Sequence, residues 1–400
     1  MFARKLSPQE YWLAGLNMAV AFESPFEFEK EREKSQSAQP DGTEEQYGAF
    51  LSQDGPPVAS LVMNRKEVRF DGHIVKMAGV GGVATQPANR RGGAIRACMV
   101  QALRDFRDEG YALSHLYPFS TAYYRQFGFA PAGQSVRWTV KLRDLRGLPE
   151  VGGTVRQLFP GDDLSPLREI YDRMYGDINF SCLRQVFDKG LEGDKPLAAK
   201  RWVFVWYDGD GVPGGLLVGT RNKDTLHCVP DFSSRDAFLF TGPTALIGLL
   251  NFVRTAFIAN FADIQFCVPA HMDLCGLLPE LSGMDCRPAL NGMARALDVE
   301  TLLRLCRCKG EGRLSLRVTD TILPENDGVF TLSFTPGGEN RVERGGDPDL
   351  TLDVGDLAVL LGGARDASSI PLTPGIALHH DTPAISQVFY RKGCHVLDLF

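Results

Sequence analysis

The chain has 400 residues and is 44% hydrophobic, enough for two or three domains with packed cores. Its formal net charge of −6 argues against a nucleic-acid partner and favours cationic substrates. No apolar run reaches the roughly 18 residues that a membrane helix needs. Nine cysteines without paired spacings indicate reduced, buried thiols of a cytoplasmic protein, and Cys306 and Cys308 have no second ligand pair that would predict a metal site.

The N-terminal stretch allows two interpretations. Residues 13–22 are apolar and follow Arg4 and Lys5, which is typical of a secretory signal peptide. Against this, Ser7 and Glu10 have the spacing of a capping box, which favours the first helix of a cytoplasmic domain. Residues 27–34 alternate in charge at helical spacing and predict a solvated helix.

Residues 47–50 and 59–69 predict two strands that lead into a third, apolar strand at residues 75–84. The sequence Gln-Pro-Ala-Asn-Arg-Arg-Gly-Gly follows, and apolar residues then recur at helical spacing up to Phe106. Glycines and a helix N-terminus after a strand suit the binding of a pyrophosphate. The alternative is an ordinary strand-to-helix turn that happens to be rich in glycine.

Residues 113–117 predict the next strand, which Pro118 breaks, and a short helix then ends at Gly128. Two motifs here resemble a known family. Arg-Arg-x-Gly at residues 90–93 resembles the acetyl-CoA loop of the GCN5-related N-acetyltransferases (GNAT), and Leu-Tyr-Pro-Phe-Ser with Tyr-x-x-Phe-Gly-Phe at residues 116–129 is similar to their Eis-type branch.

This resemblance implies roles for individual residues. Strand-edge backbone groups would receive the thioester and the pantetheine arm, and the loop would wrap the pyrophosphate. The implied acetyl-CoA contacts are Val83, Ala84, Thr85, Arg91, Gly92, Gly93, Ala94, Ile95, Arg96, Phe119 and Ser120. Tyr124 matches the family's general acid, although Tyr123 beside it leaves that assignment open. The terminal carboxylate of Phe400 would be the base.

The resemblance also divides the chain into three α/β (α+β) domains. Residues 1–150 are expected to form the acetyltransferase domain with the acetyl-CoA site, which residues 138–142 would close. Residues 151–290 repeat the pattern of strand, turn and helix without the Arg/Gly loop, and predict either a degenerate second GNAT fold or an unrelated α/β domain. Residues 291–400 resemble a sterol-carrier-type domain, which either binds a lipid or only packs and positions the C-terminus.

The sequence therefore predicts a cytoplasmic N-acetyltransferase that moves acetyl from acetyl-CoA to a primary amine, either an aminoglycoside-like polyamine or a lysine side chain. The alternative is a non-catalytic acyl-CoA- or lipid-binding sensor on the same fold. A homo-oligomer, and specifically a hexamer, is implied by the family resemblance alone.

Overall fold

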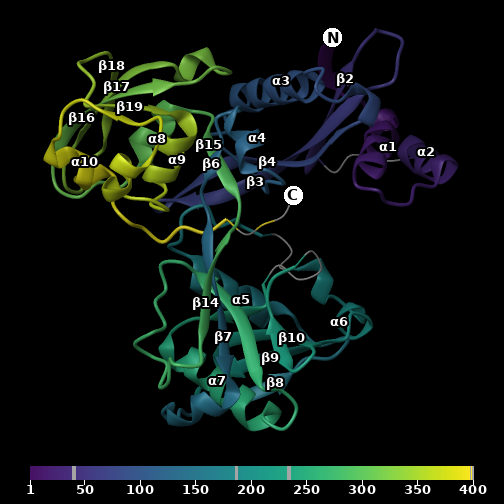
Figure 1. The fold of residues 1–400 in the computed structure, drawn as a ribbon, viewed down its shortest axis with the longest axis vertical. Helices are drawn as coiled ribbons and strands as arrows, with labels where there is room; N and C mark the ends of the chain where they lie inside the picture. Colours follow the sequence, from purple (N-terminus) through teal and green to yellow (C-terminus); the bar gives the residue numbers. More distant parts are fainter. Residues whose placement is uncertain (38–41, 185–187, 232–235, 397, 399–400) are drawn as a thin grey trace. The chain divides into compact units, whose positions relative to one another are not determined.

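The computed structural model describes residues 1–37, 42–184, 188–231, 236–396 and 398. Contacts divide the chain into two units (Figure 1). The first unit holds residues 1–132 and 292–392, and the second holds residues 133–291 and 393–398. Among the described residues, no helix has the length and apolar content needed to cross a bilayer.

The first unit contains a seven-stranded sheet. Its strands in spatial order are β1 (Phe2–Lys5), β2 (Glu44–Phe50), β3 (Ala59–Phe70), β4 (His73–Thr85), β5 (Leu113–Leu116), β15 (Met293–Ala296) and β6 (Ala130–Pro131). Strands β1 to β4 pair antiparallel, and β4 pairs parallel with β5. Because parallel neighbours need a crossover, the chain passes through α3 (Ala94–Asp108) between β4 and β5.

The second unit repeats this arrangement with other residues. Its main path in spatial order is β8 (Thr154–Gln157), β9 (Arg201–Tyr207), β10 (Pro213–Asn222), β11 (Thr225–Cys228), β13 (Asp263–Pro269), β7 (Gln134–Lys141) and β14 (Asp285–Leu290). Here β11 pairs parallel with β13, and α7 (Pro243–Phe257) is the crossover. The repeat favours the prediction of a second GNAT fold over that of an unrelated domain.

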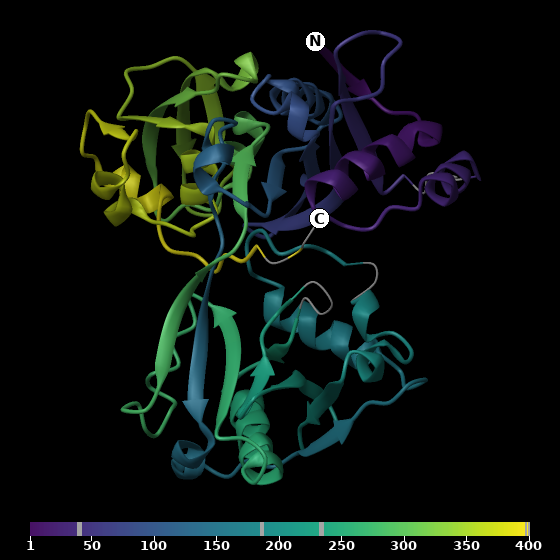
Figure 2. The ribbon, with the colours of Figure 1, turned by 45° about the vertical axis from the view of Figure 1, so that its right-hand side comes forward.

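Two strands are exchanged between these repeats, and this corrects the expectation that residues 138–142 close the first sheet. Strand β7 follows the first sheet in the chain, yet it lies between β13 and β14 of the second. Strand β15 comes after the second sheet and pairs with β5 and β6 of the first. The green β15 lies beside β6 in Figure 1, and the turned view of Figure 2 agrees. Alternating apolar residues predict that a strand is half buried, but do not identify its partner strands.

The helices of the first unit follow the sequence patterns. A capping box at Ser7 and Glu10 precedes α1 (Tyr11–Ala21), in agreement with the interpretation of this stretch as a helix. The charged helix α2 (Phe28–Ser37) is exposed, as predicted. Helix α3 buries one apolar face that includes Met99, Leu103 and Phe106 against the sheet.

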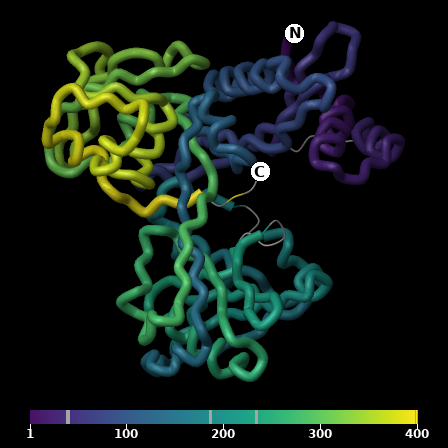
Figure 3. Tube along the Cα trace, in the orientation of Figure 1, coloured from purple at the N-terminus to yellow at the C-terminus, as the bar shows by residue number. Residues whose placement is uncertain are grey.

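A smaller five-stranded sheet completes the first unit. Its strands in spatial order are β18 (Arg341–Arg344), β17 (Gly328–Phe334), β16 (Gly312–Thr319), β19 (Leu350–Asp353) and β20 (Ala377–Leu378). Three helices accompany it: α8 (Val299–Leu305), α9 (Val354–Leu361) and α10 (Pro383–Val388). Every residue of α9 is buried, so this helix is part of the core. In the tube of Figure 3, this segment runs from green to yellow.

Candidate acetyl-CoA site

Strand β4 carries a β-bulge near its end. Ser60 lies opposite Ala84, but Val62 lies opposite Gly81, so Gly82 and Val83 together face Leu61. Gly82 has a φ of 55°, and a Cβ there would lie 2.6 Å from the Met18 sulfur. Both the backbone conformation and the packing therefore favour glycine at this position.

Strand β4 separates from β5 just before the bulge. Their parallel pairing runs from Met77 with Leu113 to Val80 with Leu116, while β4 continues to Thr85. Within the described part of the chain, the β4 residues from Gly81 onward therefore have no partner strand on the β5 side. Val83, Ala84 and Thr85 all lie in this segment, with Ala84 buried and the other two half-buried. Free peptide groups on a strand edge can pair with the amides of an extended ligand.

Hydrogen bonds hold the start of the next loop, whereas its later residues are exposed. Gln86 donates to Asn17 Oδ1 at 3.0 Å, and the buried Asn17 in turn donates to the Pro57 carbonyl at 3.1 Å. Arg91, Gly92 and Gly93 are exposed, and Arg91 has a φ of 65°, rare for a residue with a side chain.

Gly93 is the N-cap of α3, and the first helical bond runs from the Ala97 amide to the Gly93 carbonyl. The preceding amides, those of Ala94, Ile95 and Arg96, have no acceptor within the helix. Ala94 and Ile95 are buried while the Arg96 side chain is exposed. Three exposed arginines (Arg90, Arg91 and Arg96) thus lie in or next to the loop that leads to a helix N-terminus. Cations beside a helix N-terminus suit an anionic pyrophosphate, whereas an ordinary turn needs neither.

Tyr124 lies in the short helix α4 (Thr121–Arg125), inside an aromatic cluster. Its side chain is 2% exposed and makes edge contacts with Phe119 and Tyr123 at centroid distances of 5.3 and 5.2 Å. Burial, and to a lesser extent Tyr123, raises the pKa of Tyr124 above its usual value. The pKa of the half-buried Tyr123 is raised by burial as well. Phe119 is 72% exposed, and Ser120 caps α4 by accepting from the Tyr123 amide at 3.3 Å.

A buried arginine, which the sequence did not single out, supports the turn after Tyr124. Arg295 on β15 is fully buried and donates to the Phe127 carbonyl at 2.5 Å. It also pairs with Asp320 at 2.5 Å, which satisfies its charge. The Tyr124 carbonyl in turn accepts from the amides of Phe127 and Phe129. An arginine inside an otherwise apolar strand, Met-Ala-Arg-Ala, was the only sequence signal for this support.

Helix α9 packs against the same turn. A Cβ on Gly355 would lie 2.5 Å from the Gly128 carbonyl, so only glycine allows this approach. The structure therefore brings Val83 to Thr85 and the loop 91–96 together along β4 and α3, and holds Tyr124 on a separately braced turn. Phe400, the predicted base, lies outside the described residues.

Comparisons with known proteins show similarity at both ends of the chain. Residues 4–132 match the family model described as an acetyltransferase (GNAT) domain, and residues 299–389 match a sterol carrier protein domain. The N-acetyltransferases Eis of Mycobacterium tuberculosis (strain H37Ra) and Mycobacterium bovis (strain BCG Pasteur) are each 29% identical over 149 residues. Residues 4–132 are thus similar to a GNAT acetyltransferase domain, and part of the chain is similar to the Eis proteins. That alignment covers 34% of this chain and 37% of the length of these curated relatives.

Solved structures extend the similarity of fold to the whole chain. A probable N-acyltransferase of Enterococcus faecalis superposes with a TM-score of 0.80 at 21% identity, covering 100% of this chain and 99% of the other. Eis1 of Mycobacterium abscessus gives 0.78 at 18% identity and covers 100% of both chains. The expected α/β architecture, with a GNAT domain at the N-terminal end and a sterol-carrier-type domain at the C-terminal end, is confirmed. The division at residues 150 and 290 stays a prediction.

Proposed function

We propose that this protein is an acetyl-CoA-dependent N-acetyltransferase that acetylates a primary amine, either a polyamine such as an aminoglycoside or a lysine side chain. The observation that carries this proposal is the bulged end of β4, which has no partner strand on its β5 side among the described residues and leads into the arginine-rich loop and the first amides of α3. An extended pantetheine arm needs the strand edge, and a pyrophosphate needs the loop.

Backbone amides of Val83 to Thr85 would bind the thioester carbonyl and stabilise the negative charge that develops when the amine attacks. Arg91 to Arg96 would bind the pyrophosphate through the exposed arginines, the glycine amides and the helix N-terminus. Phe119 and Ser120 would border the pantetheine, where the exposed Phe119 ring offers an apolar wall.

Tyr124 would protonate the departing thiolate. A coenzyme A thiol has a pKa of about 8.5, like that of other thiols, and burial raises the pKa of Tyr124 above its usual value. The phenol therefore stays protonated at neutral pH and donates late, when most of the negative charge has reached sulfur. Tyr123 is also protonated, but it is the less buried of the pair.

The α-carboxylate of Phe400 would act as the base, or attract and orient the cationic acceptor through water. A terminal carboxyl with pKa of about 3.5 is too weak to deprotonate an ammonium group directly, so the position of the charge matters more than its basicity. A C-terminal extension should then abolish acetylation while an N-terminal tag does not. Equal turnover of the two tagged proteins would remove Phe400 from the mechanism.

The proposal includes a location in the cell and an oligomeric state. A cytoplasmic location follows from the supply of acetyl-CoA, and a homo-oligomer of hexameric order follows from the family resemblance.

The decisive experiment measures thiol release from acetyl-CoA with a panel of amines. We expect release with at least one polyamine or lysine peptide, and none without an acceptor. Acetyl-CoA binding by calorimetry without turnover on any amine would favour the non-catalytic sensor.

A further inference from the structure

The Cys306 and Cys308 thiols lie close together in the first unit, and the proposed acetyl transfer uses neither of them. Their sulfur atoms are 3.8 Å apart, just after the end of α8. Cys306 is buried, whereas Cys308 is partly exposed. The other seven cysteines include two exposed residues, Cys275 and Cys286, on the second unit.

Hydrogen bonds fix the backbone around this pair. The Arg307 amide donates to Asp71 Oδ2 at 2.7 Å, and the Arg307 carbonyl accepts from Lys392 Nζ at 3.2 Å. Asn340 Nδ2 donates to the Cys306 carbonyl at 2.7 Å and reaches the Cys306 sulfur at 3.6 Å. With Arg307 held on both sides and Cys306 held by Asn340, the two thiols stay adjacent without an entropic cost of finding each other.

The charges around the pair differ in their effect on the two thiols. Lys392 and Asp71 form a buried ion pair with a distance of 2.6 Å. The hydrogen bond with Cys306 and then the Lys392 ammonium hold the pKa of the Cys308 thiol below its usual value, against the opposing effects of burial and Asp71. The same hydrogen bond and burial raise the pKa of Cys306. Cys308 is therefore the better nucleophile, and Cys306 is a protonated thiol at its side.

We infer that Cys306 and Cys308 form a reversible thiol–disulfide site that is oxidised by a peroxide, with Cys308 attacking and Cys306 resolving. The Cys308 thiolate attacks one peroxide oxygen, which breaks the O–O bond and gives a sulfenic acid and hydroxide. The Cys306 sulfur then attacks the Cys308 sulfur, and its proton leaves with the sulfenic oxygen as water. The two thiols lose two electrons in total, and these reduce the peroxide.

Geometry also favours reversal. Bond formation requires the sulfur atoms to approach from 3.8 Å to about 2.05 Å. A disulfide closed over one intervening residue is strained, and strained disulfides are readily reduced by other thiols.

Trypsin offers a direct assay, because cleavage after Arg307 separates the two cysteines. Cleavage after Arg304 and Lys309 releases each of them in a short peptide. After hydrogen peroxide treatment, non-reducing digestion should yield Leu305–Arg307 joined to Cys308–Lys309, about 2 Da lighter than the sum of the reduced peptides. Dithiothreitol should separate them. Full-length protein in which Cys308 is over-oxidised or remains reduced, with no linked peptide, would overturn the inference.

Alkylation rates test the assigned roles. Iodoacetamide near pH 7 should modify Cys308 about tenfold or more faster than Cys275, although Cys275 is the more exposed thiol, because only the thiolate reacts. Lys392→Met should slow Cys308, whereas Lys309→Met is the matched control and should not. Cys306→Ser should trap Cys308 as a sulfenic acid that dimedone captures. Equal rates for Cys308 and Cys275, or no dimedone adduct in Cys306→Ser, would contradict these roles.

Discussion

The two repeats share a strand order but differ at the point where the first binds its proposed cofactor. In the first, β4 continues past its last pairing with β5, carries a bulge and leads into a loop with two arginines, and a third arginine lies in the first turn of α3. In the second, β11 ends at Cys228, which is also its last residue paired with β13. Helix α7 begins at Pro243, and its first basic residue is Arg254, in its last turn.

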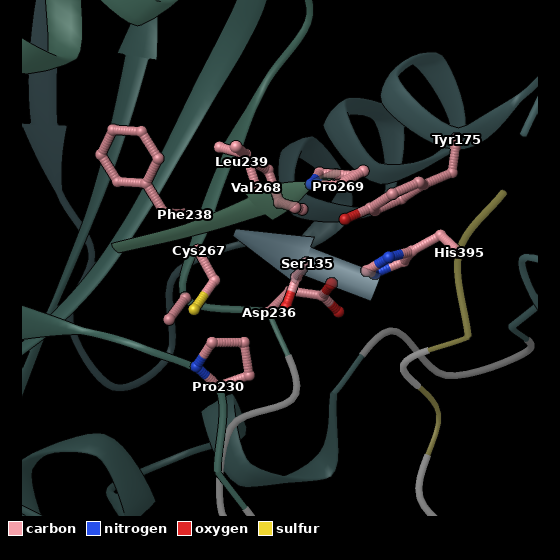
Figure 4. Close-up of a pocket in the computed structure, with 11 residues that line it drawn as sticks. Ser135, Tyr175, Pro230, Asp236, Phe238, Leu239, Cys267, Val268, Pro269 and His395 are labelled. Carbon is pink, nitrogen blue, oxygen red and sulfur yellow. The ribbon is translucent and has the colours of Figure 1, made fainter. Parts of the chain in front are cut away.

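The second unit also has a small cavity and buried polar side chains in its interior. Near Tyr175 and His395 lies a cavity of about 10 Å³, shown in Figure 4, which has room for about one water molecule. His395 stacks on Tyr175 with a centroid distance of 4.9 Å. The buried Arg184 pairs with Asp236 and, at 2.8 Å, with Asp398. The comparison teaches that both repeats keep the same strand order with different packed residues, while the proposed acetyl-CoA site depends on a few residues at the end of one strand.

Tyr124→Phe should have the largest effect of the changes that test this contrast. Removing the proton donor should lower turnover on the order of 10²–10⁴-fold, with acetyl-CoA affinity and Tm unchanged, because the ring still packs in the aromatic cluster. Steady-state kinetics and calorimetry measure both quantities. Tyr123→Phe is the matched control and should keep most activity; the reverse result would give the role to Tyr123.

Arg295→Met tests how much the buried Arg295 on β15 stabilises the first repeat. The variant leaves the buried Asp320 without the cation that pairs with it, which should cost about 3–5 kcal/mol in the free energy of unfolding. Arg4→Met breaks the ion pair with Glu10, whose side chains are both partly exposed, and should cost about 1 kcal/mol or less. Urea unfolding of both variants makes the comparison. A similar small loss in both would mean that Arg295 contributes little to stability.

Arg91→Glu probes the loop that the second repeat lacks. Replacing a charge-assisted contact with repulsion should weaken acetyl-CoA binding by about 100-fold, since such hydrogen bonds contribute about 1.5–3 kcal/mol. Arg254→Glu on α7 is the control and should leave affinity unchanged. Calorimetry should also give one acetyl-CoA per chain, and two sites per chain would contradict the contrast.

His395→Phe tests the buried polar interior of the second unit. Burial, with smaller effects of Arg184 and His271 against Asp398, lowers the pKa of His395 to about 3. Between that value and about 6.5, the unfolded chain binds a proton that the folded chain does not, so stability falls as pH falls. From pH 7 to pH 5 the wild type should lose about 2 kcal/mol more than His395→Phe.

Tryptophan fluorescence suits this measurement, because Trp138, Trp202 and Trp206 of the four tryptophans belong to the second unit. Equal acid sensitivity of the wild type and the variant would mean that another group dominates.

Local elements were predictable because their signals are local. The capping box at Ser7 and Glu10, the charged α2 and the Arg/Gly loop each depend on residues a few positions apart. The close packing around Gly82 was not predictable, because the Met18 and Val62 side chains, which leave little room for a Cβ there, approach only in the fold. Arg295 was missed for the same reason, since its partner Asp320 and the Phe127 carbonyl are distant in sequence.

The buried-thiol prediction was correct only in part. Cys98, Cys182, Cys228, Cys306 and Cys394 are buried, but Cys275 and Cys286 are exposed. A cysteine behaves as a small apolar residue wherever it lies, so residue type alone does not indicate its exposure.

The exchange of β7 and β15 has a consequence for synthesis on the ribosome. The first sheet cannot close between β5 and β6 until Met293–Ala296 has left the exit tunnel. At about 5–20 residues per second, the chain between β6 and β15 takes roughly 10–30 s to translate. During that interval β5 and β6 lack β15, the strand that lies between them and pairs with both. A truncated acetyltransferase domain ending near residue 132 would keep those edges open permanently.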